Sequence, residues 1–466
     1  MKRKKNSAPL SVNQVKIEFT RKSITPFGGI ATVVAKFLES IQFRGWVERA
    51  LPIRETSNNS KGIYGKVLAQ FLTVLAGGFR FSHVGWWECG LEALKRAFGV
   101  QWIPQAASTL TRFWNKIDSQ GMAEKFAEAG RGLATTIVGW ESITQDTLHL
   151  DSSVITRYGH QQGAKKGYNP KKPGRPSHHP LMAFLGCGYV INLWNRAGDA
   201  HAGQGAVDFF RQSVLSLGAG FRIIRVVCDC GFYNIEFIKH LEKEGYLYII
   251  AAPISRVLQR AIMAVKHWKR VAPGIEVGEF RFQHMDREWD RPRRYVVVRQ
   301  SIATRPRATG KQPSLFKELD EWEDYRFSLM ITNDEEAEAE SIWREYRPRA
   351  NDENVIKNLK EGFGLAAFSM NDFWATEASM VLNVLVFHNL IHYLNRKILN
   401  PKGPLQQLRT IRGKYFIIAA QLGKSAGYQV LRLAVKDRKL RARLTYFLEL
   451  ISLLSNRLNC IAVENG

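Results

Sequence analysis

Apolar residues recur every three or four positions through much of the first 130 residues, as in Leu68, Phe71, Leu72, Leu75 and Phe79. This spacing places them on one face of a helix with 3.6 residues per turn. The pattern therefore predicts an N-terminal region made of helices that each bury one face.

Further along the chain the pattern changes to short runs that are typical of strands. Leu148 and Leu150 alternate with polar residues, and Leu181–Trp194 contains no charged residue. The run Arg222–Asp229 is almost continuously apolar in its centre, which suits a strand buried on both faces. One strand is therefore predicted at the first and at the last of these places, and two buried strands within Leu181–Trp194.

Helices are predicted at about residues 205–217 and 234–244, between and after these strands. The order is then β-β-β-α-β-α, with an acidic residue at the end of the first strand and of the fourth. This order is the layout of a ribonuclease H-like core, a mixed five-stranded sheet with helices. Alternating runs between residues 260 and 330 predict a β-rich insertion into that α/β core.

The net positive charge of the chain indicates which kind of molecule it binds. Lys and Arg exceed Asp and Glu by 25 in this chain of 466 residues. So large a positive excess favours a polyanion such as nucleic acid. The apolar fraction of 45% supplies enough material for the cores of two to four domains.

Membrane and secretion signals are not found in the sequence. No apolar run reaches the roughly 18 residues that a spanning helix needs, and the basic start MKRKKNSAPL lacks the apolar stretch of a secretory signal. We therefore expect a cytoplasmic protein. The cysteines form no CxxC pair and are expected to be reduced packing residues; they are Cys89, Cys187, Cys228, Cys230 and Cys460.

Three acidic residues stand out by their predicted positions. Asp151 and Asp229 each follow a strand, and Glu353 lies on a helix that Pro348 is expected to begin. Carboxylates on separate rigid elements suit hard cations such as Mg²⁺, and two such ions can support phosphodiester cleavage. Taken singly, each acid is also compatible with a turn, a cap or an ordinary helical ion pair.

The segment after Asp151 carries unbalanced positive charge. Between Ser152 and Gly198 there is no acidic residue. A phosphate backbone that approaches a carboxylate cluster needs positive charge beside it, so this segment predicts a nucleic-acid substrate. Tyr168, His178 and His179 add groups that hydrogen-bond phosphates or stack on bases. The basic residues of the segment are Arg157, Lys165, Lys166, Lys171, Lys172, Arg175 and Arg196.

A second candidate for DNA contact lies in the N-terminal region. The run Ser108–Phe113 follows Pro104 and is expected to start a helix with Ser108 as its N-cap and Arg112 exposed. A reading helix of a helix-turn-helix would start in this way. A capped helix without a special function fits the same residues equally well.

These residues carry a family resemblance. Tyr346, Arg349, Glu353 and Lys360 fit the Tyr-x2-Arg-x3-Glu-x6-Lys signature of bacterial insertion-sequence DDE transposases. The stretches LDSSVITRYGHQQGAKKGYNP, GRPSHHPL and CDCGFYN are similar to the regions of the first two catalytic aspartates in that superfamily. The similarity runs from about Phe27 to the C-terminus. One departure is that cysteine, in place of serine or a similar residue, follows Asp229.

The resemblance implies a catalytic and metal-binding triad of Asp151, Asp229 and Glu353, holding two Mg²⁺ ions for which Mn²⁺ substitutes. It also implies an enzyme that binds terminal inverted repeats, cleaves the DNA ends by metal-dependent hydrolysis and joins them to target DNA in a cut-and-paste reaction. Hairpin ends are one route for the second strand. Expected partners are double-stranded DNA and, in the complex, a second copy of the chain, within the bacterial nucleoid.

The same resemblance assigns DNA contacts near the cleaved phosphate to Tyr346, Arg349 and Lys360. The expected organisation has five parts: a helical region for DNA binding or dimerisation (1–140), the first part of the core (141–258), the β-rich insertion (259–330), the second part of the core (331–398) and a helical basic region (399–466).

Two other functions remain open at this point. One is a nuclease or resolvase with the same core that cuts DNA without strand transfer. The other is a DNA-binding regulator in which the three acids have a structural role only.

Trp289 is the candidate for an aromatic ring that stacks on a flipped base. It lies between charged residues before a predicted strand of the insertion, with Arg291, Arg293 and Arg294 nearby to hold phosphates. The alternative is a tryptophan packed under the insertion sheet. Trp268 and Trp322 are rival candidates for stacking.

Overall fold

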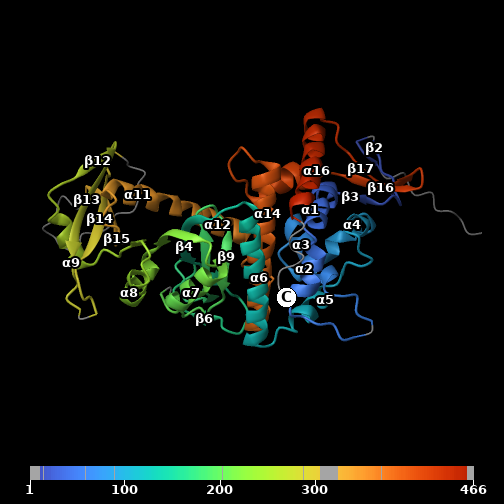
Figure 1. The fold of residues 1–466 in the computed structure, drawn as a ribbon. Coiled ribbons are helices and arrows are strands. Elements are labelled where there is room, and N and C mark those ends of the chain that lie inside the picture. Colours follow the sequence, from blue (N-terminus) through green and yellow to red (C-terminus); the bar gives the residue numbers. More distant parts are fainter. Residues whose placement is uncertain are drawn as a thin grey trace, which may run out of the picture.

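The computed structural model describes residues 11–458 apart from positions 14, 58, 89, 202, 287, 305–323 and 369. One half of the described molecule is built on a large mixed sheet, and the other half is a mainly helical body that contains both terminal regions (Figure 1). Cys89, Cys460 and Trp322 lie outside the described residues, and the three cysteines within them are free thiols.

The large sheet has nine strands among the described residues, in the order β12-β13-β14-β15-β11-β10-β4-β8-β9. Strand β10 is parallel to both β4 and β11, whereas β8 and β9 continue the sheet antiparallel on the far side of β4. The predicted order β-β-β-α-β-α is confirmed. Its elements are β4 (Gln145–Ser152), β8 (Leu181–Leu185), β9 (Val190–Trp194), α7 (Ala206–Leu217), β10 (Arg222–Cys228), η3 (Cys230–Phe232), α8 (Ile235–Lys243) and β11 (Tyr248–Ala251).

The segment predicted as a β-rich insertion continues this same sheet. Strand β15 pairs antiparallel with β11, so the insertion strands extend the core sheet through backbone hydrogen bonds. An apolar cluster that includes Ile249 of β11 and Val296 of β14 packs under the junction. The elements are α9 (Arg256–Met263), β12 (Lys269–Ala272), β13 (Ile275–Phe282), β14 (Arg293–Ser301) and β15 (Tyr325–Thr332).

The helical N-terminal region is largely as predicted, with two differences. Helix α3 ends at Ala76 because Gly77 adopts a left-handed conformation with φ of 97°, so Phe79 lies beyond the helix and is exposed. The N-cap of α5 is Ala106 without a side-chain hydrogen bond, so the N-cap role of Ser108 was wrong. The helices are η1 (Ile30–Val34), α1 (Ala35–Ser40), α2 (Phe43–Ala50), α3 (Tyr64–Ala76), η2 (Phe81–Trp87), α4 (Leu91–Ala97), α5 (Ala107–Trp114) and α6 (Gln120–Trp140).

The C-terminal region contains a β-hairpin as well as helices, which the sequence did not predict. Strand β16 of this hairpin pairs with the short N-terminal strand β3, so the two ends of the chain form one body. Short strands β1 (Ser11–Val12) and β2 (Val15–Lys16) precede β3 (Ile24–Thr25). The C-terminal elements are α15 (Leu408–Ile411), η7 (Arg412–Phe416), β16 (Ala420–Ser425), β17 (Tyr428–Leu433) and α16 (Arg438–Leu458).

A long buried helical segment joins the two halves of the molecule. It is made of α13 (Phe373–Val381), η5 (Leu382–His388), α14 (Asn389–Leu394) and η6 (Asn395–Leu399). The side-chain amide of Asn389 accepts a hydrogen bond from Val190 N at 3.0 Å and donates one to Val190 O at 2.7 Å. Val190 belongs to β9, the last strand of the sheet, so a helix side chain satisfies backbone groups that a further strand would otherwise pair.

No single helix in the described ranges is long and apolar enough to cross a membrane. Only α3 and η2 taken together reach the length and composition of a span, and they are bent by 85° relative to each other.

Candidate active site

The two predicted aspartates lie side by side because their strands are parallel neighbours. Cys228 of β10 is level with Leu150 of β4, so Asp229 and Asp151 follow at the same edge of the sheet. The Arg349 guanidinium bridges them: its Nη2 lies 3.1 Å from Asp151 Oδ2 and 3.7 Å from Asp229 Oδ2. Asp229 is also held by Gly231 N, which donates to its Oδ1.

Arg349 reaches this site from a continuous helical segment of the chain. The segment consists of α11 (Ala339–Tyr346), the turn η4 (Arg347–Arg349) and α12 (Ala350–Glu361). Pro348 lies within η4, so α12 begins two residues after the predicted start.

Glu353 lies on the same side of the helical segment as two residues that contact β4 or the residues just after it. Arg349 is one turn before it and contacts Asp151, while Lys360 is two turns after it and donates from Nζ to Val154 O at 3.0 Å. Glu353 itself is exposed. Along the helix it therefore lies between these two contacts.

Burial and neighbouring charge set the protonation of this site. Burial raises the pKa of Asp151 to about 7, Arg349 opposes the rise, and the charge of Asp229 adds to it. Burial alone would lower the pKa of Arg349, but Asp151 and Asp229 raise it above its usual value. Burial and the charge of Lys171 lower the pKa of Lys360. Burial raises the pKa of Tyr346 to about 12, with Asp229 among its neighbours.

The buried carboxyl of Asp151 has a consequence for stability in metal-free buffer. Because its pKa is about 7 in the folded chain against 3.8 for the free group, the folded state binds more protons than the unfolded state between these pH values. The free energy of unfolding should therefore fall as pH rises from about 4 to 7, by up to about 4 kcal/mol. Chemical denaturation across this range, with Asp151→Asn as control, measures the effect. If the free energy of unfolding changed equally with pH in the two proteins, the prediction would be wrong.

A buried polar pair lies directly behind the aspartates, and sequence reasoning missed it. His149 Nδ1 is 2.7 Å from Asp352 Oδ2, and His149 Nε2 is 2.9 Å from Thr147 Oγ1. Both side chains of the pair are buried. His149 precedes Asp151 by two positions on β4 and therefore shares its face of the strand, which is the sequence signal for it. The pair fastens α12 to β4 at the residue next to Glu353.

The oxygen donors fit a hard divalent cation, although they do not form a complete ligand set. Asp151 and Asp229 already share one cationic group, and both offer carboxylate oxygens. Among the described residues no group of three or more His, Cys, Asp and Glu is close enough to hold a metal. The charge of Asp352 also acts on Asp151 and Arg349, whereas Glu353 lies one helical turn from Arg349 and is exposed.

The basic segment after Asp151 forms a small three-stranded sheet beside the site. Its strands are β5 (Ile155–Thr156), β7 (Pro176–His178) and β6 (Lys165–Lys166), in that order. Five predicted DNA-contacting residues are exposed on it: Lys165, Lys166, Lys171, Lys172 and Arg175.

Two of these exposed cations lie close to the ring of Tyr158. Lys172 Nζ lies 5.2 Å from the centre of the ring, and the guanidinium of Arg175 lies 6.0 Å from it. A third, Lys165, forms an ion pair with Asp199.

Other residues of this segment are turned into the protein. Arg157 is 4% exposed and donates to His178 Nδ1 and to Ala366 O, so the structure gives it a packing role in place of the expected DNA contact. His178 and His179 are buried as well. His179 lies 3.0 Å from Ser152 Oγ and supports the residue next to Asp151.

Trp289 is 9% exposed, which favours the packing alternative over base stacking. Its ring packs against Tyr233 and His284, with centroids 5.4 and 4.4 Å away. Tyr233 lies four residues after Asp229, so the tryptophan supports the loop that follows the second aspartate. Trp268 is half-buried and stacks on Arg299.

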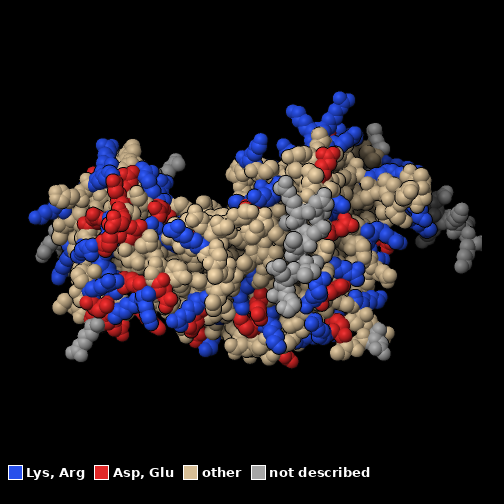
Figure 2. Space-filling model, viewed as in Figure 1, with Lys and Arg blue, Asp and Glu red and all other residues tan. Residues whose placement is uncertain are grey.

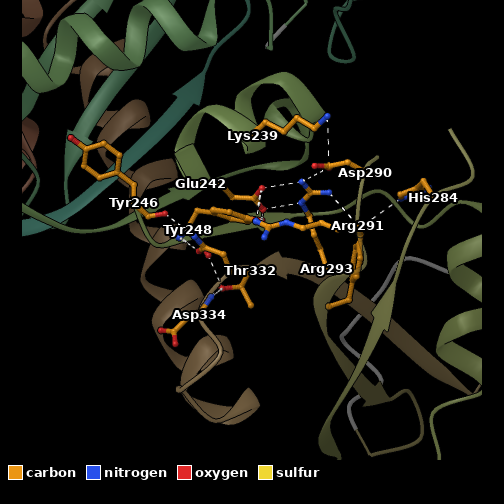
Figure 3. Close-up of polar contacts among 12 residues, drawn as sticks. Lys239, Glu242, Tyr246, Tyr248, His284, Asp290, Arg291, Arg293, Thr332 and Asp334 are labelled. Atoms are coloured by element: carbon orange, nitrogen blue, oxygen red, sulfur yellow. Dashed lines mark hydrogen bonds and ion pairs between the residues drawn. The ribbon is translucent and has the colours of Figure 1, made fainter. Parts of the chain in front are cut away.

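The arginines beside Trp289 are neutralised within the protein, contrary to the expected phosphate contacts (Figure 3). Arg293 forms two hydrogen bonds with Glu242, at 2.8 and 2.9 Å, and Arg291 pairs with the same carboxylate. Arg294 pairs with Glu279. The sequence shows the positive charges at these positions but not the acids that meet them in space.

Arg112 is exposed on α5, as expected. It lines a cavity of about 340 Å³ together with Lys61, Lys116 and Trp102. This cavity belongs to the N-terminal body, apart from the aspartates.

Comparisons with known proteins add the following. Residues 7–454 match the family described as Transposase DDE domain group 1. Among solved structures, the chain is similar to a cryo-EM structure of the piggyBac transposase synaptic complex with hairpin DNA, at 12% identity and a TM-score of 0.42. That match covers 96% of this chain and 89% of the other. No curated protein matches the chain in sequence.

Proposed function

The chain belongs to the family of transposase DDE domains, group 1, and on this premise we propose that it cuts DNA at the ends of its own insertion sequence and joins them to target DNA. The main support for the proposal is that the carboxylates of Asp151 and Asp229 both lie close to the guanidinium of Arg349. These carboxylates end adjacent parallel strands, and the helix that supplies the arginine carries Glu353 one turn later.

In this proposal Asp151, Asp229 and Glu353 would hold two Mg²⁺ ions, which supply an activated water and charge stabilisation during phosphodiester cleavage. Arg349 holds the two aspartates together and offsets their repulsion. The strands β9, β8, β4, β10 and β11 would form the ribonuclease H-like core that positions the three acids.

The exposed cations beside the site are proposed to guide the DNA backbone. Lys360 contacts the segment after Asp151, and the charge of Lys171 is close enough to act on it. Lys166, Lys172 and Arg175 extend this positive surface. Because DNA carries one charge about every 1.7 Å of its axis, such a row of cations suits one phosphate backbone. A homodimer on paired inverted repeats completes the proposal.

The test supplies the purified protein with linear DNA that carries the inverted repeats of its element. Cleavage at the repeat ends is expected with Mg²⁺ or Mn²⁺ and none in chelator, because the proposed ligands are all carboxylates. Full cleavage in chelator would contradict the metal site.

Strand transfer separates this proposal from a nuclease with the same core. Incubation of pre-cleaved ends with supercoiled plasmid should give plasmid covalently joined to the ends. Cleavage without any joined product would favour the nuclease, and specific binding without cleavage would favour a regulator.

A further inference from the structure

We propose that a second surface, far from the aspartates, binds duplex DNA of the element end. It is formed by the β16–β17 hairpin and the first turns of α16. This assignment deepens the proposed function and rests on it for the identity of the DNA. The surface, called the C-terminal basic surface below, consists of Lys424, Arg432, Lys436, Arg438, Lys439, Arg441 and Arg443.

The chain around this surface is strongly basic. Between Asn400 and Leu448 the sequence has eleven Lys and Arg, and its only acidic residue is Asp437. That carboxylate is already engaged as a helix cap, accepting hydrogen bonds from Lys439 N at 2.7 Å and Leu440 N at 3.2 Å. All seven residues of the surface are exposed, and no ion pair joins any of them to an acid in the described chain.

Arginines on strands β13 and β14 are, by contrast, neutralised by acidic residues of the protein. There Arg281, Arg294 and Arg299 each pair with a glutamate. Figure 2 shows the same contrast, since acidic and basic side chains alternate over the insertion half, whereas basic side chains project almost alone at the end of the molecule where Figure 1 places α16. The C-terminal basic surface lacks such internal neutralisation.

Helix α16 begins with basic residues. Arg438, Lys439 and Arg441 occupy the first turn of this helix, where the partial positive charge of the helix end disfavours cations. Their placement therefore costs stability, and of the three side chains only that of Arg441 has a described local contact, a hydrogen bond to Val435 O at 2.9 Å. A phosphate bound at this end would be favoured by the side chains and by the helix terminus together.

The shape of the hairpin also suits duplex DNA. Strand β16 pairs with β3 at Ala420 and Gln421, and Leu422 N donates to Ser23 O; beyond this point the hairpin is a two-stranded ribbon among the described residues. Its tip turns at Ala426 and Gly427, both with positive φ, and the next residue, Tyr428, is 77% exposed. A two-stranded ribbon of this kind fits the major groove of B-DNA.

Location gives the surface a separate task. Figure 1 places the hairpin at the opposite side of the terminal body from β4 and α12. DNA that reaches both places must extend inward from the cleaved end. The C-terminal basic surface would therefore contact the interior of the repeat.

The test compares two variants that each lose four charges. The first replaces Arg432, Lys436, Arg438 and Lys439 by glutamine. The control replaces four other exposed basic residues that have no ion pair among the described residues: Lys125, Lys243, Arg256 and Lys266. Binding is measured by fluorescence anisotropy over a salt series, with end duplexes of about 30 bp and about 10 bp, three turns and one turn.

For the long duplex, the first variant should reduce the slope of log affinity against log salt by about three to four, since each lost phosphate contact changes it by about 0.9. The control variant should keep the wild-type slope. For the short duplex, the first variant should have the same slope as wild type. Equal slopes for the two variants on the long duplex would overturn the proposal. So would an unchanged slope together with loss of the dimer, which would assign the surface to a protein partner.

These outcomes are independent of catalysis. Wild-type protein that binds the ends without cutting them would refute the proposed function, while the slopes would still decide the role of this surface. Equal melting temperatures of the two variants show that neither substitution acts through unfolding.

Discussion

Replacing Asp151, Asp229 or Glu353 singly by the matching amide is expected to reduce cleavage of DNA ends by about a thousandfold or more. The reason is that each carboxylate would help to hold ions that contribute several kcal/mol of charge stabilisation in the transition state. Binding of end DNA should be unchanged or tighter, because each change removes negative charge near phosphates. Gel assays of cleavage and of binding on the same DNA separate the two effects.

Asp352 provides a matched control for Glu353, since the two carboxylates are adjacent in the chain. Asp352 is buried and contacts His149, so it links α12 to β4, whereas Glu353 is exposed. Asp352→Asn retains a hydrogen-bonding side chain. Its rate of DNA cleavage should therefore fall by only about ten- to a hundredfold, as is usual when residues that support metal ligands are replaced. An active Glu353→Gln beside an inactive Asp352→Asn would instead make Asp352 the third acid of the site.

The second large effect concerns salt. Binding of a short end duplex should weaken by about 10³ to 10⁵ between 50 and 200 mM salt if six to ten phosphates are contacted. Replacing Lys165, Lys166, Lys171 and Lys172 together by glutamine should flatten this dependence. Lys165 is expected to contribute least because Asp199 already pairs with it.

The control for this prediction is the variant that lacks Lys125, Lys243, Arg256 and Lys266, which should retain the full dependence. If the affinity for the short duplex depended on salt equally in both variants, the DNA would have to bind away from the small sheet β5-β7-β6.

The central sheet was predictable because its signal is local. The apolar centre of Arg222–Asp229 indicates a buried parallel strand, and parallel neighbours bring their following residues together, so Asp151 and Asp229 could be paired from sequence. That β15 pairs with β11 was not predictable, since no local pattern states which distant strand an edge will meet. The C-terminal hairpin was missed because Gly423 and Gly427 interrupt a short polar run.

The meeting of Asp151 and Asp229 was predictable from sequence, the place of Glu353 stays a prediction, and the contacts of the basic residues were harder to predict. A sequence shows how many arginines a segment has but not which way they point. Arg157 turns inward to His178, and Arg293 turns to Glu242, fifty-one positions away in the chain. His149 and Asp352 were missed for the same reason, because their contact joins residues 203 positions apart.

The contact between Asn389 and β9 also sets an order of events during synthesis. Val190 leaves the ribosome 199 residues before Asn389, which is about 10 to 40 s at ordinary rates of translation. Throughout that interval the nascent sheet has an open strand edge, able to pair with another chain. By the time Asn389 covers it, α12 and Glu353 have also been made. A product truncated before Phe373 would therefore keep the open edge, and we expect it to aggregate or be degraded and not to persist as a competitor for DNA ends.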